Sequence, residues 1–94
     1  MVKLKEWEEV EKELFTPEEI AIAKFRASII CQLVDARNSK KISQRQLEKL
    51  CGVKQPIISR IEQGLAVPRL DTILKILLSL GKTIEIKDLD KVKE

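Results

Sequence analysis

Residues 54–60, KQPIISR, carry two basic and two polar side chains within two helical turns. A glutamine can pair in bidentate fashion with adenine and an arginine with guanine, and each pairing is worth about 1–3 kcal/mol of discrimination. A proline offers only apolar contact, for example to a thymine methyl group. We therefore predict contacts with base edges from Lys54, Gln55, Pro56, Ser59 and Arg60.

A second polar group precedes this stretch and suits the phosphate backbone. The first backbone N–H groups of a helix have no partner within it and can hold an anion. Ser43 and Gln44 stand at such a predicted start, with basic residues on either side. The predicted phosphate contacts are Lys40, Ser43, Gln44, Arg45 and Arg69. For all of these polar residues, ordinary solvent exposure is the alternative interpretation.

Other chemistry has little support in the composition. The chain has no histidine and no tyrosine, which removes the usual general base and most metal sites. Its two cysteines, Cys31 and Cys51, are too few for a zinc site and are expected to be buried free thiols. We predict no enzyme activity, no catalytic residue, no cofactor, no metal and no small-molecule substrate.

Two short helices around a tight turn would position both polar groups. Ser43 is a suitable N-cap for the first, and Gly52 can take the positive φ that ends it. The second tolerates Pro56 in its first turn and ends at Gly64. The residues expected to face inward are Leu47, Leu50, Cys51, Ile58 and Ile61. This pattern predicts a helix-turn-helix, whose second helix fits a DNA major groove.

The stretch resembles the core of the Xre (Cro/C1-type) repressor family, which in outline runs S/T-Q-x-x-L-A, then G-V, then S-Q-x-x-I-S-R-x-E-x-G. The matching residues are Ser43, Gln44, Leu47, Gly52, Val53, Gln55, Ile58, Ser59, Arg60, Glu62 and Gly64. Lys54 departs from the family's frequent Ser/Thr cap, a loss of about 0.5–2 kcal/mol, and Glu48 replaces a frequent alanine. The resemblance also implies an ion pair between Arg37 and Glu62.

The net charge of +3 is unevenly distributed along the chain. Residues 1–23 hold three basic and seven acidic residues, whereas residues 24–69 hold ten basic and three acidic ones. The positive charge therefore surrounds the predicted helix-turn-helix and favours a phosphate backbone, while the acidic end suits a basic partner. A mixed solvated surface is the alternative.

Residues 3–15 predict an acidic amphipathic helix with a narrow apolar stripe. The apolar residues of this segment are Leu4, Trp7, Val10, Leu14 and Phe15. A tryptophan on so short a segment either docks on the chain's own body or anchors a partner. The sequence leaves both open.

A longer helix should begin after Thr16, where Pro17 and Glu19 complete a capping pattern, and should end near Ser39. It is apolar on two nearly opposite faces. One face must pack on the core of the domain, and the other needs the N-terminal helix, a second subunit or a different protein.

A further helix runs from Leu70, with Leu70, Ile73, Leu77 and Leu80 on its inner face, until Gly81 ends it. Residues 82–87 then alternate and predict a β-strand that pairs with its copy across a two-fold axis. The predicted dimer interface comprises Leu74, Leu78, Ile84 and Ile86. A frayed tail is the alternative.

We expect an all-α, lambda-repressor-like helix-turn-helix bundle. The predicted units are an N-terminal helix at 1–15, a DNA-binding domain at 16–81 and a strand and tail at 82–94. No apolar run is long enough to span a bilayer and no signal-peptide pattern opens the chain, so we expect a cytoplasmic protein with no membrane contact.

The order of segments over residues 15–87 further resembles HigA-type antitoxins within the Xre family. That resemblance implies a homodimer that binds a palindromic double-stranded operator, represses its own operon, and neutralises a RelE-like (HigB-type) ribonuclease toxin. The acidic N-terminal helix would then be the toxin-binding surface. A solitary phage or metabolic repressor, and a module that binds only proteins, are the alternatives.

Overall fold

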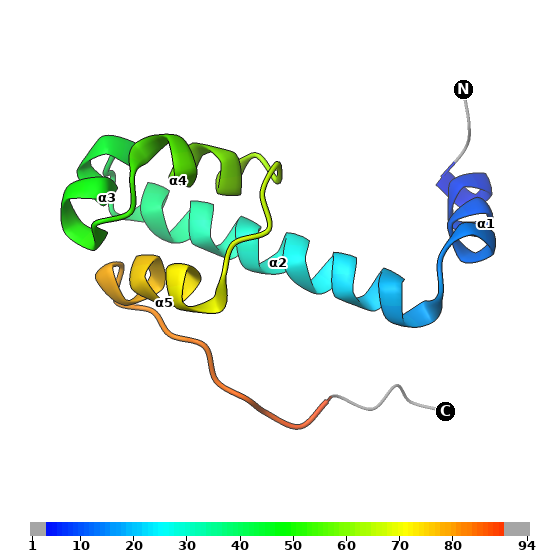
Figure 1. The fold of residues 1–94 in the computed structure, drawn as a ribbon. Helices are drawn as coiled ribbons and strands as arrows, with labels where there is room; N and C mark the ends of the chain where they lie inside the picture. The colour runs from blue at the N-terminus through cyan, green and yellow to red at the C-terminus, as the bar shows by residue number, and fades with distance from the viewer. Residues whose placement is uncertain (1–3, 90–94) are drawn as a thin grey trace.

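Five helices make up the fold in the computed structural model, which describes the backbone of residues 4–89 and the side chains of residues 6–89 (Figure 1). They are α1 (Leu4–Leu14), α2 (Pro17–Ser39), α3 (Gln44–Cys51), α4 (Gln55–Glu62) and α5 (Leu70–Ser79). The all-helical class predicted from the sequence is confirmed.

Side-chain caps define where α2 and α3 begin. The Thr16 hydroxyl accepts from the Glu19 backbone N–H at 3.1 Å, and the Glu19 carboxylate accepts from the Thr16 N–H at 2.8 Å. Ser43 and Gln46 form the same reciprocal pair at 3.1 and 2.7 Å. Each pair satisfies two backbone donors that a helix start would otherwise leave without partners.

The core lies between the C-terminal half of α2 and helices α3, α4 and α5. Six large side chains in it are at most 1% exposed, which leaves little room for any change of volume. The core residues are Leu33, Ala36, Leu47, Val53, Ile58, Ile61, Ile73, Ile76, Leu77 and Leu80. These contacts fix α3 and α4 on the end of α2.

The N-terminal half of α2 projects beyond this core and carries α1 at its far end (Figure 1). The radius of gyration is 16.0 Å, against about 12 Å expected for a compact domain of this length. Exposed apolar side chains on the projecting part include Ile22 at 56% and Phe25 at 62%. These two residues share the face of α2 that carries Leu33 and Ala36, so the bundle covers this face over its C-terminal half and leaves it open over its N-terminal half.

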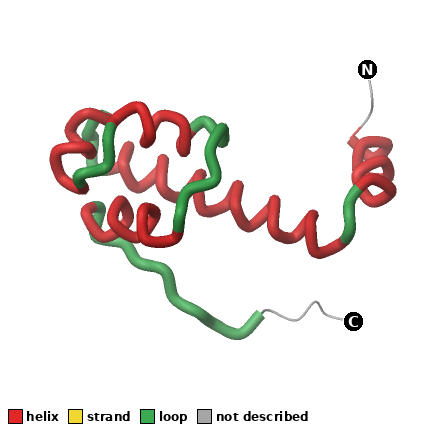
Figure 2. The backbone as a smooth tube through the Cα atoms, viewed as in Figure 1, coloured by secondary structure: helices red, strands yellow, loops and turns green. Residues whose placement is uncertain are grey.

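The strand predicted at residues 82–87 is absent, because residues 82–89 form a loop (Figure 2). A strand requires a neighbouring strand for its backbone hydrogen bonds, and none lies beside this segment within residues 4–89. Ile84 packs against the core, whereas Ile86 is fully exposed. The alternating pattern therefore did not predict the conformation of this segment.

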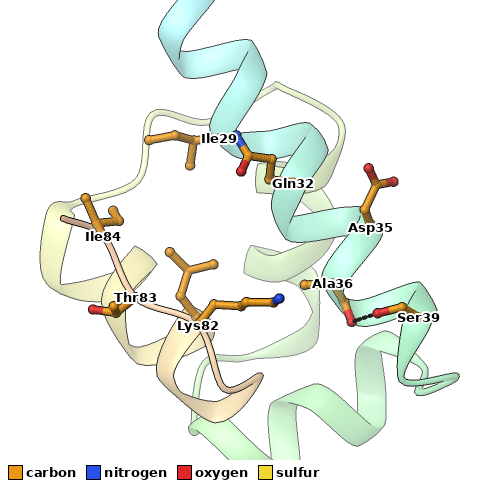
Figure 3. Close-up of a pocket in the computed structure, with 9 residues that line it drawn as sticks. Ile29, Gln32, Asp35, Ala36, Ser39, Lys82, Thr83 and Ile84 are labelled. Carbon is orange, nitrogen blue, oxygen red and sulfur yellow. Dashed lines mark hydrogen bonds between the residues drawn. The ribbon is translucent and has the colours of Figure 1, made fainter. Parts of the chain in front are cut away.

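The loop instead runs beside α2 and α5. Figure 3 shows Lys82, Thr83 and Ile84 around a cavity of about 400 Å³, with the Lys82 side chain extending toward α2. Ile29 and Ala36 line the cavity from α2. None of the predicted base or phosphate contacts lines it.

Three further expectations about burial were wrong. Leu50 is 60% exposed because α3 turns Leu47 and Cys51 toward the core and leaves Leu50 at the edge. Leu70 is 68% exposed because it is the first residue of α5, before that helix reaches the core. Cys31 is exposed on α2, and only Cys51 is half-buried.

Candidate nucleic-acid interface

A left-handed glycine makes the turn between α3 and α4. Gly52 has φ 81° and ends α3 by donating its N–H to the Glu48 carbonyl at 2.8 Å. Val53, in the turn, is buried and ties the connection to the core. The chain can therefore redirect into α4 within three residues, which is the connection of a helix-turn-helix.

One face of α4 is buried and the other is open to solvent. Ile58 and Ile61 are at most 1% exposed, so they fix the rotation of the helix about its axis. Of the five predicted base contacts, Lys54, Pro56 and Arg60 are exposed and Gln55 and Ser59 are half-buried. The structure thus brings all five together on and beside one short helix.

A chain of side-chain hydrogen bonds braces α4 against α2 and α3. Arg37 donates to Glu62 through Nε at 2.7 Å and Nη2 at 2.8 Å, and through Nη1 to the Ile42 carbonyl at 2.9 Å. Gln44 Nε2 donates to Glu62 Oε1 at 2.9 Å, and Gln55 Nε2 donates to Gln44 Oε1 at 2.7 Å. The ion pair implied by the resemblance is thus one end of a network that reaches the reading helix.

The charges of the ion pair are stabilised by this arrangement. Burial acts to raise the pKa of Glu62, but hydrogen bonds from Arg37 and Gln44 and the Arg37 charge outweigh it, so the pKa lies below the ordinary value. The hydrogen bond to Glu62 raises the pKa of Arg37. Both groups are therefore charged at neutral pH.

The start of α3 gathers most of the predicted phosphate contacts. Ser43 is its N-cap, Gln44 and Arg45 are its first two residues, and Lys40 is the C-cap of the preceding helix. Lys40, Ser43 and Arg45 are exposed. They form one basic and hydrogen-bonding edge at a helix N-terminus, a position that favours anions.

Arg69 stands apart from that edge. It precedes α5, whose first turn lies beside the middle of α2 rather than near α3 (Figure 1). Its Nε lies 3.6 Å from Asp71 Oδ1, in an ion pair whose side chains are 84% and 69% exposed. The structure does not bring this residue together with the other predicted phosphate contacts.

Two elements of the site were not predicted. The first is the Gln44–Gln55 hydrogen bond, and the second is Glu48, whose Oε1 accepts from the Gln55 backbone N–H at 3.0 Å. Gln44 and Glu48 are four residues apart and share a face of α3, which is visible in the sequence. Their orientation toward α4 depends on how the helices pack, which the sequence pattern does not specify.

A second exposed surface lies on α1, at the other end of α2 from α3 (Figure 1). Four of its predicted apolar residues remain substantially exposed: Trp7 at 49%, Val10 at 39%, Leu14 at 66% and Phe15 at 46%. The side chain of the fifth, Leu4, lies outside the described residues. The other positions of the helix are five glutamates and two lysines, so this surface is apolar with a mainly acidic surround.

The residues predicted for a dimer interface divide into two kinds. Leu74 and Ile84 are half-buried, and Ile84 packs on the core of its own chain. Leu78 is 63% exposed and Ile86 is fully exposed. Within the described part of the chain, Leu78 is thus only partly covered and Ile86 is not covered at all.

Two other kinds of site are absent from the described residues. No group of three or more Cys, Asp or Glu side chains there could hold a metal ion. None of the helices described is long and apolar enough to cross a membrane.

Comparisons with known proteins agree with this geometry. The family model HTH_3, described as helix-turn-helix, matches residues 33–87. An uncharacterized HTH-type transcriptional regulator of Haemophilus influenzae is 49% identical over 80 residues, which are 85% of this chain and 82% of that protein. A chain in a solved toxin-antitoxin module from Streptococcus pneumoniae is also 49% identical, with a TM-score of 0.71 over 88% of this chain and 92% of that one.

Proposed function

The chain belongs to the helix-turn-helix family, and from that premise we propose that it is a sequence-specific DNA-binding antitoxin. In this proposal it represses its own operon as a dimer and neutralises a small basic RelE-like ribonuclease toxin. The observation that carries the DNA-binding part is the braced and exposed face of α4. The observation that carries the antitoxin part is the likeness to the toxin-antitoxin module together with the uncovered surface of α1.

The hydrogen bond from the Gln55 side chain to Gln44 leaves the groups that can pair with adenine free. One N–H of its side-chain amide is donated to Gln44, which leaves the second N–H and the Oε1 oxygen. Those two groups are the donor and acceptor that pair with N7 and the N6 amino group of adenine. Arg60 would read a guanine, and Lys54, Pro56 and Ser59 would contact neighbouring bases.

Phosphate contacts would position this helix in the groove. Lys40, Ser43, Gln44 and Arg45 lie along one edge at the start of α3, where charged side chains and helix amides both favour an anion. Arg69 would reach a phosphate only farther along the duplex. These contacts would supply most of the salt-dependent affinity.

A dimer would place two such helices about 34 Å apart on a palindromic operator. We assign the contact to the predicted residues Leu74, Leu78, Ile84 and Ile86, of which Leu78 and Ile86 have exposed apolar surface to bury. Pairing of β-strands is not part of this assignment, because residues 82–89 form a loop.

The toxin would bind on α1, through Leu4, Trp7, Val10, Leu14 and Phe15. A solitary repressor would be expected to pack Trp7 against its own domain, whereas Trp7 here is 49% exposed on a helix outside the bundle. Exposed aromatic residues are frequent anchors in protein interfaces. The acidic surround would select a basic partner and speed its association.

The DNA-binding part is tested by comparing two arginine variants across a library of operator sequences. Arg60→Ala should relax the preference at one base position. Arg45→Ala should weaken binding to all sequences alike and reduce the slope of log affinity against log salt by about one. Identical base profiles for wild type and the Arg60 variant would overturn the assignment of Arg60.

The antitoxin part is tested by coexpressing the chain with the product of the adjacent reading frame. Deleting residues 1–15 or making Trp7→Ala should abolish or greatly weaken the complex, with operator affinity kept within a few-fold. Leu65→Ala, at a 72% exposed apolar residue of the loop between α4 and α5, is the matched control and should leave the complex intact. If toxin affinity survives the deletion, the α1 surface is not the binding site, and if no such partner exists, the solitary repressor is the correct alternative.

A further inference from the structure

The start of α4 has no side-chain cap of its own. Its N-cap is Lys54, whose ammonium group is only a donor and makes no capping hydrogen bond. By contrast, α2 and α3 begin with hydroxyl caps that bond to backbone N–H groups. The helix that carries the predicted base contacts therefore needs its acceptor from somewhere else.

The backbone donors of this first turn can be accounted for one by one. Pro56 has no N–H, and the N–H groups of Ile57 and Ile58 both donate to the Lys54 carbonyl, at 2.9 and 3.0 Å. Gln55 is the one that remains. Its N–H donates to Glu48 Oε1 at 3.0 Å, so a carboxylate on α3 completes the start of α4.

Glu48 is not the only residue of α3 that holds Gln55. Gln44, one helical turn earlier on α3, accepts from the Gln55 side chain at 2.7 Å. One helix face thus holds both the backbone and the side chain of the same residue. Two points of attachment fix the position and the rotamer of Gln55, where one would leave the side chain free to pivot.

We propose that Glu48 is a positioning residue for base recognition: its carboxylate replaces the missing cap of α4 and holds Gln55 in the orientation that reads its base. This inference rests on the proposed DNA-binding function for its consequence, but the hydrogen bond itself can be measured without DNA. Lys54 and Glu48 both depart from the pattern of the resembled family. In this proposal the carboxylate of Glu48 compensates for the capping side chain that Lys54 does not supply.

The first experiment uses the full chain in the absence of DNA. Amide hydrogen exchange should show the Gln55 N–H protected in wild type and in Glu48→Gln, which keeps an acceptor oxygen. Glu48→Ala should lower that protection about tenfold or more, because a hydrogen bond to a charged group is lost. Equal protection in all three proteins would overturn the proposal whatever the chain does with DNA.

The second experiment measures base preference by competition among operator variants. The position read by Gln55 is defined as the one at which Gln55→Ala changes the profile. At that position we expect Glu48→Ala to lower the preference about fivefold or more, while Glu48→Gln retains it. Glu18→Ala, the same change at an exposed site in the first turn of α2, should leave the profile unchanged.

A merely structural role would give a different result. Loss of fold or stability in Glu48→Ala would weaken binding to every sequence and leave the relative preferences intact, and that outcome would refute a positioning role. If Glu48→Ala does not fold, Glu48→Asp withdraws the acceptor by one methylene and takes its place. If wild type shows Gln55 protection but no sequence preference, the proposed function fails and the proposal that Glu48 positions a base contact fails with it, while the cap remains.

Discussion

Removal of Arg37 tests whether the ion-pair network holds the bundle together. In Arg37→Ala the Glu62 carboxylate loses two hydrogen bonds and its counter-charge and keeps only the bond from Gln44. The side chains of Arg37 and Glu62 are 13% and 7% exposed, so water replaces the lost donors poorly. The Ile42 carbonyl loses its donor as well.

The expected cost follows from leaving one charge of a buried pair without its partner. Such changes cost about 3–5 kcal/mol, and the space left by the arginine side chain admits some water, so we expect about 3 kcal/mol. In a domain of this size that corresponds to a fall in melting temperature of roughly 12–24 °C. Arg26→Ala, at an exposed arginine of the same helix, should change stability by less than about 0.5 kcal/mol.

The pH dependence gives the same experiment a second readout. The pKa of Glu62 is lowered in the folded wild type, so its stabilisation is present above the ordinary glutamate pKa and is lost as the pH falls through the lowered value. In Arg37→Ala the carboxylate is desolvated without its counter-charge, which raises its pKa and makes protonation favour the folded state. The difference in stability between the two proteins should therefore shrink in acid.

Urea denaturation followed by circular dichroism at neutral and acid pH measures both effects. The reasoning is refuted if Arg37→Ala costs less than about 1 kcal/mol at neutral pH, within the range of an exposed ion pair. It is refuted equally if the difference between wild type and variant grows as the pH falls.

Four further variants test the fold. Gly52→Ala should cost about 1–2 kcal/mol by thermal denaturation, from backbone strain alone, because φ is 81° and a Cβ there would meet nothing within 4 Å. Leu33→Ala should cost about 2–5 kcal/mol by urea denaturation, because Leu33 is 0% exposed, whereas Trp7→Ala should change global stability by less than about 0.5 kcal/mol. Thr16→Ala should increase amide exchange in the first turn of α2 without changing that of α3 or α4, because it removes a cap distant from the core.

Local sequence rules predicted the elements well where neighbouring residues decide the conformation. Ser43 and Thr16 cap helices, and Gly52 has positive φ, because each depends on a backbone geometry set within three or four residues. Ile58 and Ile61 were assigned correctly to the buried face of α4, since a helix of two turns presents one face to the core.

Sequence patterns failed to predict burial and conformation where these depend on which other element packs against the residue. Leu50 and Leu70 match the apolar period of their helices, but the core does not extend as far as either side chain. Residues 82–87 have the alternation of a strand but no partner for its backbone. Glu48 was predicted only as a departure from a family pattern, because its role depends on the approach of α4 rather than on α3.

The projecting half of α2 also separates the acidic surface of α1 from the polar edge of α3 and α4. The separation is larger than the distance over which exposed charges interact in salt solution. At 1.5 Å per residue, the 23 residues of α2 span about 34 Å, and its part beyond the core accounts for roughly half of that length. The Debye length at physiological ionic strength is about 8 Å. The glutamates of α1 therefore exert little direct repulsion on phosphates at α3 and α4. A protein seated on α1 would change operator occupancy through its own bulk or charge, or through the spacing of two copies, and only weakly by neutralising that helix.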